Sequence, residues 1–344
     1  MGNQRSTWGR APKTLKKSLL DILRSPVNGT HLSVENAATL GGDVVSGELV
    51  SARGDRYPIV DSIPRFVGEE NYAQSFGLQW THFRRTQLDS YSGLPISSRR
   101  FYTFTGWHPA ELAGKRVLEV GCGSGRFTEV VLDAGARVVA VDYSRAVDAC
   151  LANHSSRNNL DVVQADIYHL PFEANSFDFV FCFGVLQHTP DVHRAFSSLV
   201  PQLKAGGRLA VDVYPKLLRN LLWSKYWIRP VTKRMATQRL FQRVQRWTPR
   251  LLRVSRALSR VPLLGRGLRY SLPVVNYEGV YELSREQLEE WAILDTFDML
   301  APAFDQPQTE ATVKHWFANA ALEEVSVERI GFVVGRGRRP SRLT

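Results

Sequence analysis

The sequence contains few cysteines, and their spacing shows no pairing. The three residues, Cys122, Cys150 and Cys182, are widely separated along 344 residues. A disulfide framework needs an even, closely placed set, and a cysteine-based zinc site needs pairs about two residues apart. The spacing therefore argues against both, and we expect no bound metal and a reducing compartment, the cytoplasm.

A long apolar run is also missing. The only apolar stretch near the N-terminus, residues 19–23, is interrupted by Asp21, whereas a membrane-spanning helix needs about 20 apolar residues. We therefore expect neither an export signal nor a transmembrane helix. The composition, 44% hydrophobic and 22% charged, is that of a folded globular chain.

Acidic residues are absent from residues 213–277, although this segment contains 15 lysines and arginines and the whole chain has a formal net charge of +11. Trp223, Trp227 and Trp247 lie among the arginines. Such a segment suits anionic lipid headgroups, a phosphorylated substrate or RNA phosphates, and a solvated helical lid is the alternative. Because no RNA-binding motif accompanies the charge, we expect an anionic acceptor or peripheral association with the inner face of the membrane.

Changes in composition divide the chain into six parts. A polar tail is followed by a small module with glycine-separated strands, a cap rich in aromatic residues, and a stretch of apolar strands alternating with helices. The basic segment then interrupts this α/β pattern, which returns near the C-terminus. The predicted boundaries are 1–16, 17–70, 71–112, 113–213, 214–280 and 281–340.

The α/β part predicts a Rossmann-like, seven-stranded, mostly parallel sheet with helices on both faces. Helices are expected at 288–294 and 310–320, and a terminal antiparallel pair at 323–329 and 331–335. In the small module, a helix is expected at 19–24, followed by strands separated by Gly41-Gly42, Gly47 and Gly54. The other predicted strands are 116–120, 136–142, 161–165, 177–183 and 207–214.

A glycine-rich loop follows the first of these strands. It reads Gly121-Cys122-Gly123-Ser124-Gly125 and runs into a predicted helix. Glycines let a ligand approach the backbone, and the free amides of a helix N-terminus favour a polar ligand. Asp142 ends the next strand, where a carboxylate can accept both hydroxyls of a ribose. The sequence therefore predicts a nucleoside site.

The residue after the loop separates two nucleoside-binding families. A dinucleotide fingerprint needs Gly or Ala at position 126, and this chain has Arg126. The spacing Glu119-x-Gly121-x-Gly123-x-Gly125 instead resembles the class I methyltransferases, which use S-adenosylmethionine. The resemblance implies that residues 113–213 are the cofactor-binding half of the domain. It assigns cofactor binding to Glu119, Gly121, Cys122, Gly123, Gly125, Asp142, Tyr143, Asp166, Ile167, Phe183 and Gly184.

Two residues, Asp166 and His188, each have two interpretations. Asp166 could be the N-cap of a short helix as well as a cofactor ligand. His188, in the stretch Leu186-Gln187-His188 after the fourth strand, is the candidate general base, or else it only orients the loop or the cofactor. The Pro-Pro motif of many nitrogen-methylating enzymes is absent here, so the resemblance favours the group that methylates small molecules, lipids, quinones and sugars.

The wider resemblance is to a bacterial methyltransferase subgroup that accompanies surface-polysaccharide assembly. It rests on residues 75–80, 181–191, 291–298 and 304–307. It implies transfer to a hydroxyl of a sugar or glycan intermediate, small or lipid-linked, with Trp80, Gln187 and Asp295 as candidate substrate residues. An RNA methyltransferase and a cofactor-binding scaffold without catalysis remain the competing interpretations.

The N-terminal module resembles the short zinc-ribbon family whose members pair with, or are fused to, methyltransferases. Where that family has its first metal-binding knuckle, this chain has Ser25-Pro26-Val27-Asn28, and the second cysteine pair is replaced by Ser51 and Gly54. Hydroxyl, amide and glycine supply none of the thiolates that structural zinc needs. The resemblance therefore implies a degenerate ribbon without zinc.

Overall fold

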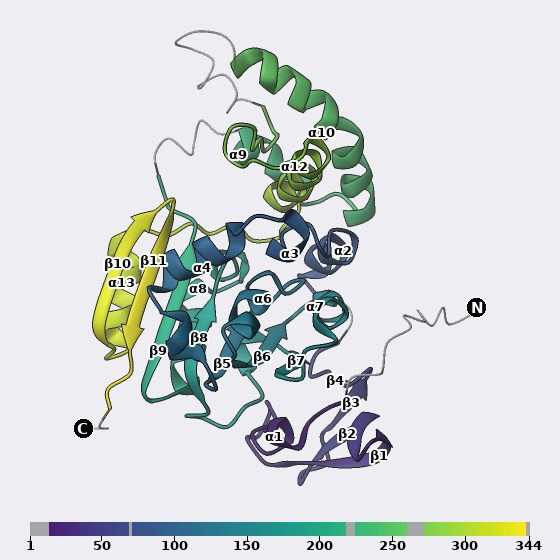
Figure 1. Cartoon of the computed structure of the whole chain (residues 1–344), viewed down its shortest axis with the longest axis vertical. Helices are drawn as coiled ribbons and strands as arrows, with labels where there is room; N and C mark the ends of the chain where they lie inside the picture. Colours follow the sequence, from purple (N-terminus) through teal and green to yellow (C-terminus); the bar gives the residue numbers. More distant parts are fainter. Residues whose placement is uncertain (1–13, 69–70, 218–223, 260–271, 342–344) are drawn as a thin grey trace.

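The structure is a computed structural model that describes residues 14–68, 71–217, 224–259 and 272–341. A small β-module lies at one end, a large sheet covered by helices lies in the middle, and a helical layer with α9, α10 and α12 lies at the other end (Figure 1). Residues 1–13 of the predicted tail, and Trp223 in the basic segment, lie outside the described residues. Leu15 is buried and donates its amide to Val44, so structure begins before the predicted boundary at residue 17.

The central sheet confirms the predicted fold. Its seven strands follow the order β10-β11-β9-β8-β5-β6-β7, and β11 alone runs antiparallel to its neighbours. The order places the carboxyl ends of β5, β6 and β8 at one edge, where parallel α/β sheets bind ligands. The strands are β5 (Arg116–Val120), β6 (Arg137–Asp142), β7 (Leu160–Gln164), β8 (Phe177–Cys182), β9 (Leu203–Val213), β10 (Glu323–Ile330) and β11 (Phe332–Arg338).

The predicted strand starts are accurate except for one. The fifth strand was expected from residue 207, after a turn, but β9 already begins at Leu203. Leu203 pairs with Phe177, and a register shift then accommodates the extra residues before Arg208 pairs with Phe179. The expected turn is therefore an irregularity inside the strand.

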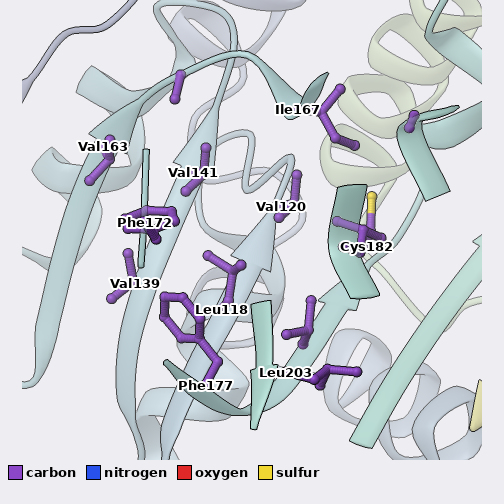
Figure 2. Packing of buried hydrophobic residues seen from close by; sticks show 14 of the residues in the cluster. Leu118, Val120, Val139, Val141, Val163, Ile167, Phe172, Phe177, Cys182 and Leu203 are labelled. Atoms are coloured by element: carbon purple, nitrogen blue, oxygen red, sulfur yellow. The ribbon is translucent and has the colours of Figure 1, made fainter. Parts of the chain in front are cut away.

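Helices cover both faces of the sheet because successive strand side chains alternate between the faces. On one face Leu118, Val139 and Val163 come from three neighbouring strands and pack with Phe172 and Phe177 (Figure 2). Helices α8 (Val192–Leu199) and α13 (Glu310–Asn319) cover part of this face. The opposite face packs against α4 (Ile96–Thr105), α6 (Arg126–Asp133) and α7 (Ala146–His154).

The N-terminal module is a four-stranded antiparallel sheet in sequence order, preceded by α1 (Lys17–Leu20). The helix is shorter than the predicted 19–24 because the backbone at Leu23 and Arg24 turns to bond with residues 171–173. Gly47 does not separate two strands as predicted. It lies within a strand opposite a bulge, where a side chain would meet the carbonyl of Glu35. The strands are β1 (Leu32–Leu40), β2 (Asp43–Ser51), β3 (Arg56–Val60) and β4 (Ile63–Pro64).

The two turns that the resemblance aligned with metal knuckles are joined by a carboxylate. Oδ2 of Asp55 accepts hydrogen bonds from Ser25 Oγ at 3.1 Å, Asn28 Nδ2 at 2.5 Å and Ser51 Oγ at 2.8 Å. Among the residues that the structure describes, no group of three or more His, Cys, Asp or Glu is placed to hold a metal ion. Hydrogen bonds to Asp55 thus link the turns of this module.

The module docks on the open edge of the central sheet. Arg65 forms a parallel bridge with Gln164 of β7, and its guanidinium binds Gln164 Oε1 at 2.9 Å and Asp148 Oδ1 at 2.6 Å. At the other side of the module, Arg24 pairs with Glu173 at 2.6 Å. An unpaired edge strand is a site of aggregation, and this contact covers it.

Two further groups of helices belong to the predicted cap and the predicted basic segment. The aromatic cap contains α2 (Gln74–His82), α3 (Asp89–Ser92), α4 and α5 (Pro109–Leu112), and the basic segment contains α9 (Ser224–Thr232) and α10 (Thr237–Ser259). The helix predicted at 288–294 is the longer α12 (Arg285–Leu300), because Ser284 and Gln287 form a capping box at its start. A shared apolar cluster joins α10, α12 and Phe83 of the cap.

Candidate functional site at the carboxyl ends of the strands

The glycine loop after β5 has a backbone that only glycine adopts easily. Gly121, Gly123 and Gly125 all have positive φ, at 84°, 52° and 90°. A Cβ at Gly121 would lie 2.1 Å from Val185 Cγ2, and one at Gly125 would lie 2.5 Å from His154 Nε2. Each glycine is therefore required by both its conformation and its neighbours.

Asp142 fixes the same loop from the end of β6. Its Oδ2 accepts the amide hydrogen of Gly123 at 2.9 Å, and its Oδ1 accepts from the amide and hydroxyl of Ser144 at 2.8 and 2.7 Å. Burial raises the pKa of this carboxyl, while these hydrogen bonds oppose the shift. The carboxylate is thus held beside the glycine loop by three hydrogen bonds.

Glu119 and Cys122 are buried beneath the loop. Burial raises the pKa of the Glu119 carboxyl well above its usual range, and Thr128 Oγ1 donates a hydrogen bond to it. Thr128 belongs to α6, so this bond ties the start of the helix to the strand. The contact places Glu119 as a residue that orients the loop.

The residues predicted for the adenine side lie around the end of β7. Asp166 accepts the amide hydrogen of Tyr168 at 2.9 Å and is therefore an N-cap, the structural alternative raised from the sequence, while its side chain stays one quarter exposed. Ile167 is buried next to it. Tyr72, which the sequence analysis did not single out for this role, packs its ring 4.9 Å from that of Tyr143. Burial and the nearby Asp166 raise the pKa of Tyr72.

Phe183 and Gly184 follow β8 with different surroundings. The ring of Phe183 packs among buried aromatic rings, 5.5 Å from Phe127 by centroid, so its side chain belongs to the core. The amide of Gly184 donates to Asp212, which pairs with Arg100 at 2.7 Å. Only the backbone of this segment borders the ligand-binding edge.

His188 presents an unpartnered nitrogen in a buried position. Its Nδ1 lies 2.9 Å from the carbonyl oxygen of Phe304, which can only accept a hydrogen bond. Nδ1 of the neutral ring therefore carries the hydrogen, and Nε2 carries the lone pair. Nε2 is buried without a hydrogen-bond partner among the described residues, as are both amide atoms of the neighbouring Gln187. Buried polar atoms are normally paired, so a ligand is the expected partner.

Helix α2 connects the two halves of the site. The indole of Trp80 lies 3.1 Å from where a Cβ of Gly123 would be, and the ring of Phe76 lies 5.4 Å from the imidazole of His188. Aromatic side chains of one helix thus cover both the glycine loop and His188. The aromatic residues of 71–112 therefore include side chains at the site as well as side chains packed in the core.

A cluster of charged and hydroxyl groups lies beside His188. The ring of Tyr214, which follows β9, lies 5.4 Å from the imidazole by centroid, and its hydroxyl donates to Asp298 at 3.3 Å. Asp305 is buried and pairs with Lys225 of α9 at 3.0 Å. From the sequence, Asp298 and Asp305 were candidates for the acceptor pocket, with caps or turn residues as the alternative, whereas Tyr214 and Lys225 were not predicted. The position of Tyr214 directly after a parallel strand was the signal that could have found it.

Asp295, a predicted substrate residue, is held by protein side chains. It accepts hydrogen bonds from the Tyr277 hydroxyl and from Gln87 Nε2, the latter at 3.2 Å. Gln87 also accepts from Arg126, whose pKa burial lowers to about 10. Burial raises the pKa of the Asp295 carboxyl to about 6. The contacts place Asp295 where α12 meets the cap.

Comparisons with known proteins agree with this geometry. Residues 118–211 match a family described as a methyltransferase domain. The chain is 36% identical over 115 residues to a ubiquinone biosynthesis O-methyltransferase of Coxiella burnetii, covering 33% of this chain and 49% of that protein. It is 36% identical over 120 residues to a demethylmenaquinone methyltransferase of Thermobifida fusca, covering 32% and 51%. The chain therefore matches about half the length of these curated relatives.

Among solved structures, a methyltransferase dependent on S-adenosylmethionine from Aquifex aeolicus aligns with 78% of this chain and 99% of its own, at 12% identity and a TM-score of 0.41. A likeness at this level carries no argument about function, whereas the family match covers the glycine loop, Asp142 and His188. The half of the sheet that contains these residues is therefore similar to a methyltransferase domain, whose cofactor is S-adenosylmethionine.

Proposed function

We propose that this chain is an S-adenosylmethionine-dependent methyltransferase that transfers a methyl group to a hydroxyl. The observation that carries the proposal is Nε2 of His188, a buried nitrogen after β8 that has no hydrogen-bond partner in the described part of the chain. A hydroxyl is a weak acid, so its oxygen needs a base as it attacks. The relative from Coxiella burnetii is an O-methyltransferase, which supports oxygen as the accepting atom.

The residues of the loop suit the cofactor. Gly121, Gly123 and Gly125 keep side chains out of the loop, and Asp142 offers carboxylate oxygens at the end of the adjacent strand. Tyr143 follows Asp142 at the end of β6, and the partly exposed Asp166 follows β7, where the adenine would bind. When bound, S-adenosylmethionine supplies an activated methyl group on a sulfonium, and its own sulfur is the leaving group.

The protein contributes positioning and proton transfer. His188 Nε2 would take the hydroxyl proton of the acceptor as its oxygen attacks the methyl group that the cofactor would supply, with the cofactor's sulfur as the leaving group. The carbonyl of Phe304 holds the ring in the tautomer that can accept the proton. Trp80 and Phe76 cover the site and exclude water, which favours an in-line displacement between aligned groups.

The acceptor that we propose is a sugar or glycan intermediate, small or lipid-linked. Both amide atoms of Gln187 are buried and have no partner among the residues that the structure describes, so one side chain offers a donor and an acceptor beside the proposed base. Neighbouring hydroxyls of a sugar ring need such a pair. Lys225 and Asp305 add a charged pair next to the same place. Of the candidate substrate residues, Trp80 and Gln187 support this interpretation.

Mass spectrometry of cell-envelope glycans and lipids tests the acceptor. Cells without the gene should lack one methyl group on one glycan or glycolipid, and the gene should restore it. His188→Gln should lower turnover by about a hundredfold or more and fail to restore it. The exposed His315 on α13 provides the matched control, because His315→Gln leaves the site unchanged. If the turnover of His188→Gln fell only a few fold, His188 would not be the general base.

Calorimetry separates the competing interpretations. The wild type and His188→Gln should bind S-adenosylmethionine equally, since the glycine loop and Asp142 are intact in both. Binding without turnover on any sugar, quinol or lipid acceptor would favour a scaffold, and turnover that nuclease abolishes would favour RNA. We also propose that residues 17–70 are a degenerate zinc-ribbon-like module, similar to the ribbons that pair with methyltransferases.

A further inference from the structure

Helix α10 displays one strongly basic face. Counting 100° per residue, its exposed side chains fall in a sector of about 180°, opposite the apolar side that packs on α12, and all the exposed arginines lie within about 120° of it. We call this sector the arginine face. It consists of Arg239, Arg243, Arg246, Trp247, Arg250, Arg253 and Val254. In Figure 1, α10 lies at the periphery of the molecule, far from the central sheet.

The charge of the arginine face is not compensated within the described part of the chain. None of the ion pairs found there involves its five arginines, and residues 213–277 contain no acidic residue. Arg250 lies over the ring of Trp247 and bonds to the carbonyl of Arg246, so it stays within the face. Uncompensated cations on one helix face attract an anionic surface.

Large apolar side chains are exposed among these arginines. Trp247 is 52% exposed and Val254 is 47% exposed. On α9, Trp227 and Val231 are exposed by 73% and 66%, one helical turn apart. Exposure of such side chains to water is unfavourable in free energy. The interfacial region of a bilayer, in contrast, accommodates tryptophan and aliphatic side chains next to arginines that bind the headgroups. Valine offers nothing to stacked bases, so this combination favours lipid over RNA.

We propose that the arginine face of α10 binds the surface of a membrane that contains anionic lipids, with Trp247 and Val254 entering the headgroup region. Among the described residues no helix is both long and apolar enough to cross a bilayer, which makes the contact peripheral. The proposal rests on this surface and does not depend on methyl transfer.

The contact would also orient the proposed active site. On the other side of the basic segment, Lys225 and Arg229 of α9 reach Asp305 beside His188. The basic segment thus contains both the residues that we propose to contact the lipid surface and residues that pair with Asp305 beside His188. A lipid-linked acceptor would reach His188 without leaving the bilayer surface.

Vesicle sedimentation with the full chain tests the proposal. The protein should sediment with vesicles of phosphatidylcholine mixed with phosphatidylglycerol, remain free with phosphatidylcholine alone, and bind less as salt rises. Each arginine near an anionic surface contributes about fivefold to partitioning. The combined variant Arg246→Gln, Arg250→Gln, Arg253→Gln should therefore bind about a hundredfold more weakly. Trp247→Ser should also weaken binding, because it removes apolar insertion at unchanged charge.

The matched control removes the same charge elsewhere. Arg99, Arg137 and Lys314 are exposed on other elements, and their combined change to Gln should leave binding within about threefold of the wild type. An equal loss in this control would show that net charge alone drives adsorption and would overturn the proposal. So would the absence of sedimentation at low salt, or binding to single-stranded RNA under conditions where the vesicles bind nothing. Equal methyl-transfer rates in all variants would leave the proposed function standing in either case.

Discussion

At the residue scale, the chemistry of the site follows from which polar atoms the protein leaves without partners. Asp142 has three protein hydrogen bonds, and Glu119 has one from Thr128, so these carboxyls shape the loop. Within the described ranges, His188 Nε2 and the Gln187 amide have none. We therefore expect the carboxyls to shape the glycine loop, and His188 and Gln187 to contact the proposed acceptor.

The carboxyl of Asp295 gives the protein a pH-dependent stability. Burial raises its pKa to about 6 from 3.8, so the folded state holds the proton more tightly than the unfolded chain. The stabilisation by this proton is fully present below about pH 4 and is lost as the pH rises through 6, by about 3 kcal/mol. The difference in unfolding free energy between wild type and Asp295→Asn should therefore fall by that amount between pH 4 and pH 7.

Urea unfolding at several pH values measures this difference. The asparagine cannot titrate, yet it keeps an oxygen for the hydroxyl of Tyr277. Asp21→Asn, at an exposed site on the N-terminal module, serves as the control for general effects of pH. A difference that stays constant from pH 4 to pH 7 would show that Asp295 is already ionised in the folded protein at low pH.

At the scale of elements, short segments join parts of the chain that are distant in sequence. Helix α2 covers the glycine loop with Trp80 and His188 with Phe76. Arg126, at the start of α6, donates to Ser97 and Gln87 of the cap at 2.8 and 3.0 Å. The residue that excludes a dinucleotide fingerprint therefore has a structural role, which is to fasten the cap to the cofactor-binding half.

In the N-terminal module, hydrogen bonds to Asp55 link two turns of the chain. It binds both turns, and hydrogen bonds to a charged group each contribute about 1.5–3 kcal/mol at full strength. Asp55→Ala should lower the stability of the module by about 3 kcal/mol, because Ser25, Asn28 and Ser51 lose their common acceptor. Hydrogen exchange of residues 25–60 should then accelerate, while exchange in β5 and β6 stays slow. Asp21→Ala should change neither, and unchanged exchange in Asp55→Ala would contradict the assigned link.

At the scale of the whole molecule, the β-module is fastened to the edge of the Rossmann-like sheet. The side chain of Arg65 is 14% exposed, and it bonds to both Gln164 of β7 and Asp148 of α7. Together with the bridge from Leu23 to Phe172, it makes the module an extension of the large domain. The edge strand β7 is thereby protected.

Arg65→Ala should loosen this junction. Loss of two hydrogen bonds at a largely buried site should cost about 2 kcal/mol and expose the β7 edge. Thermal unfolding should occur earlier, and hydrogen exchange at residues 160–164 should be faster. Arg145→Ala is the matched control, because Arg145 is 60% exposed and pairs with the same Asp148. Exposed pairs contribute at most about 1 kcal/mol, so equal effects in the two variants would contradict the docking role.

The sequence by itself determined the fold class and the place of the glycine loop and Asp142 in it. Apolar strands alternating with helices specify a parallel sheet, and local spacing places Gly121, Gly123, Gly125 and Asp142 at neighbouring strand ends. These inferences succeed because they depend on contacts between segments close in the chain. The sequence of residues 25–28 and 51–54 likewise showed that the thiolates of a zinc ribbon are absent there. Only the structure showed that Asp55 bonds to both of these turns.

Tertiary structure alone decided which side chains surround His188. Four side chains from separate parts of the chain lie near His188: Tyr214, Lys225, Asp298 and Asp305. Their local sequence does not predict that they lie close together. The tautomer of His188 depends on the carbonyl of Phe304, which lies 116 residues away. Which polar atoms remain unpartnered is a property of the packed chain, because each one is defined by everything that surrounds it.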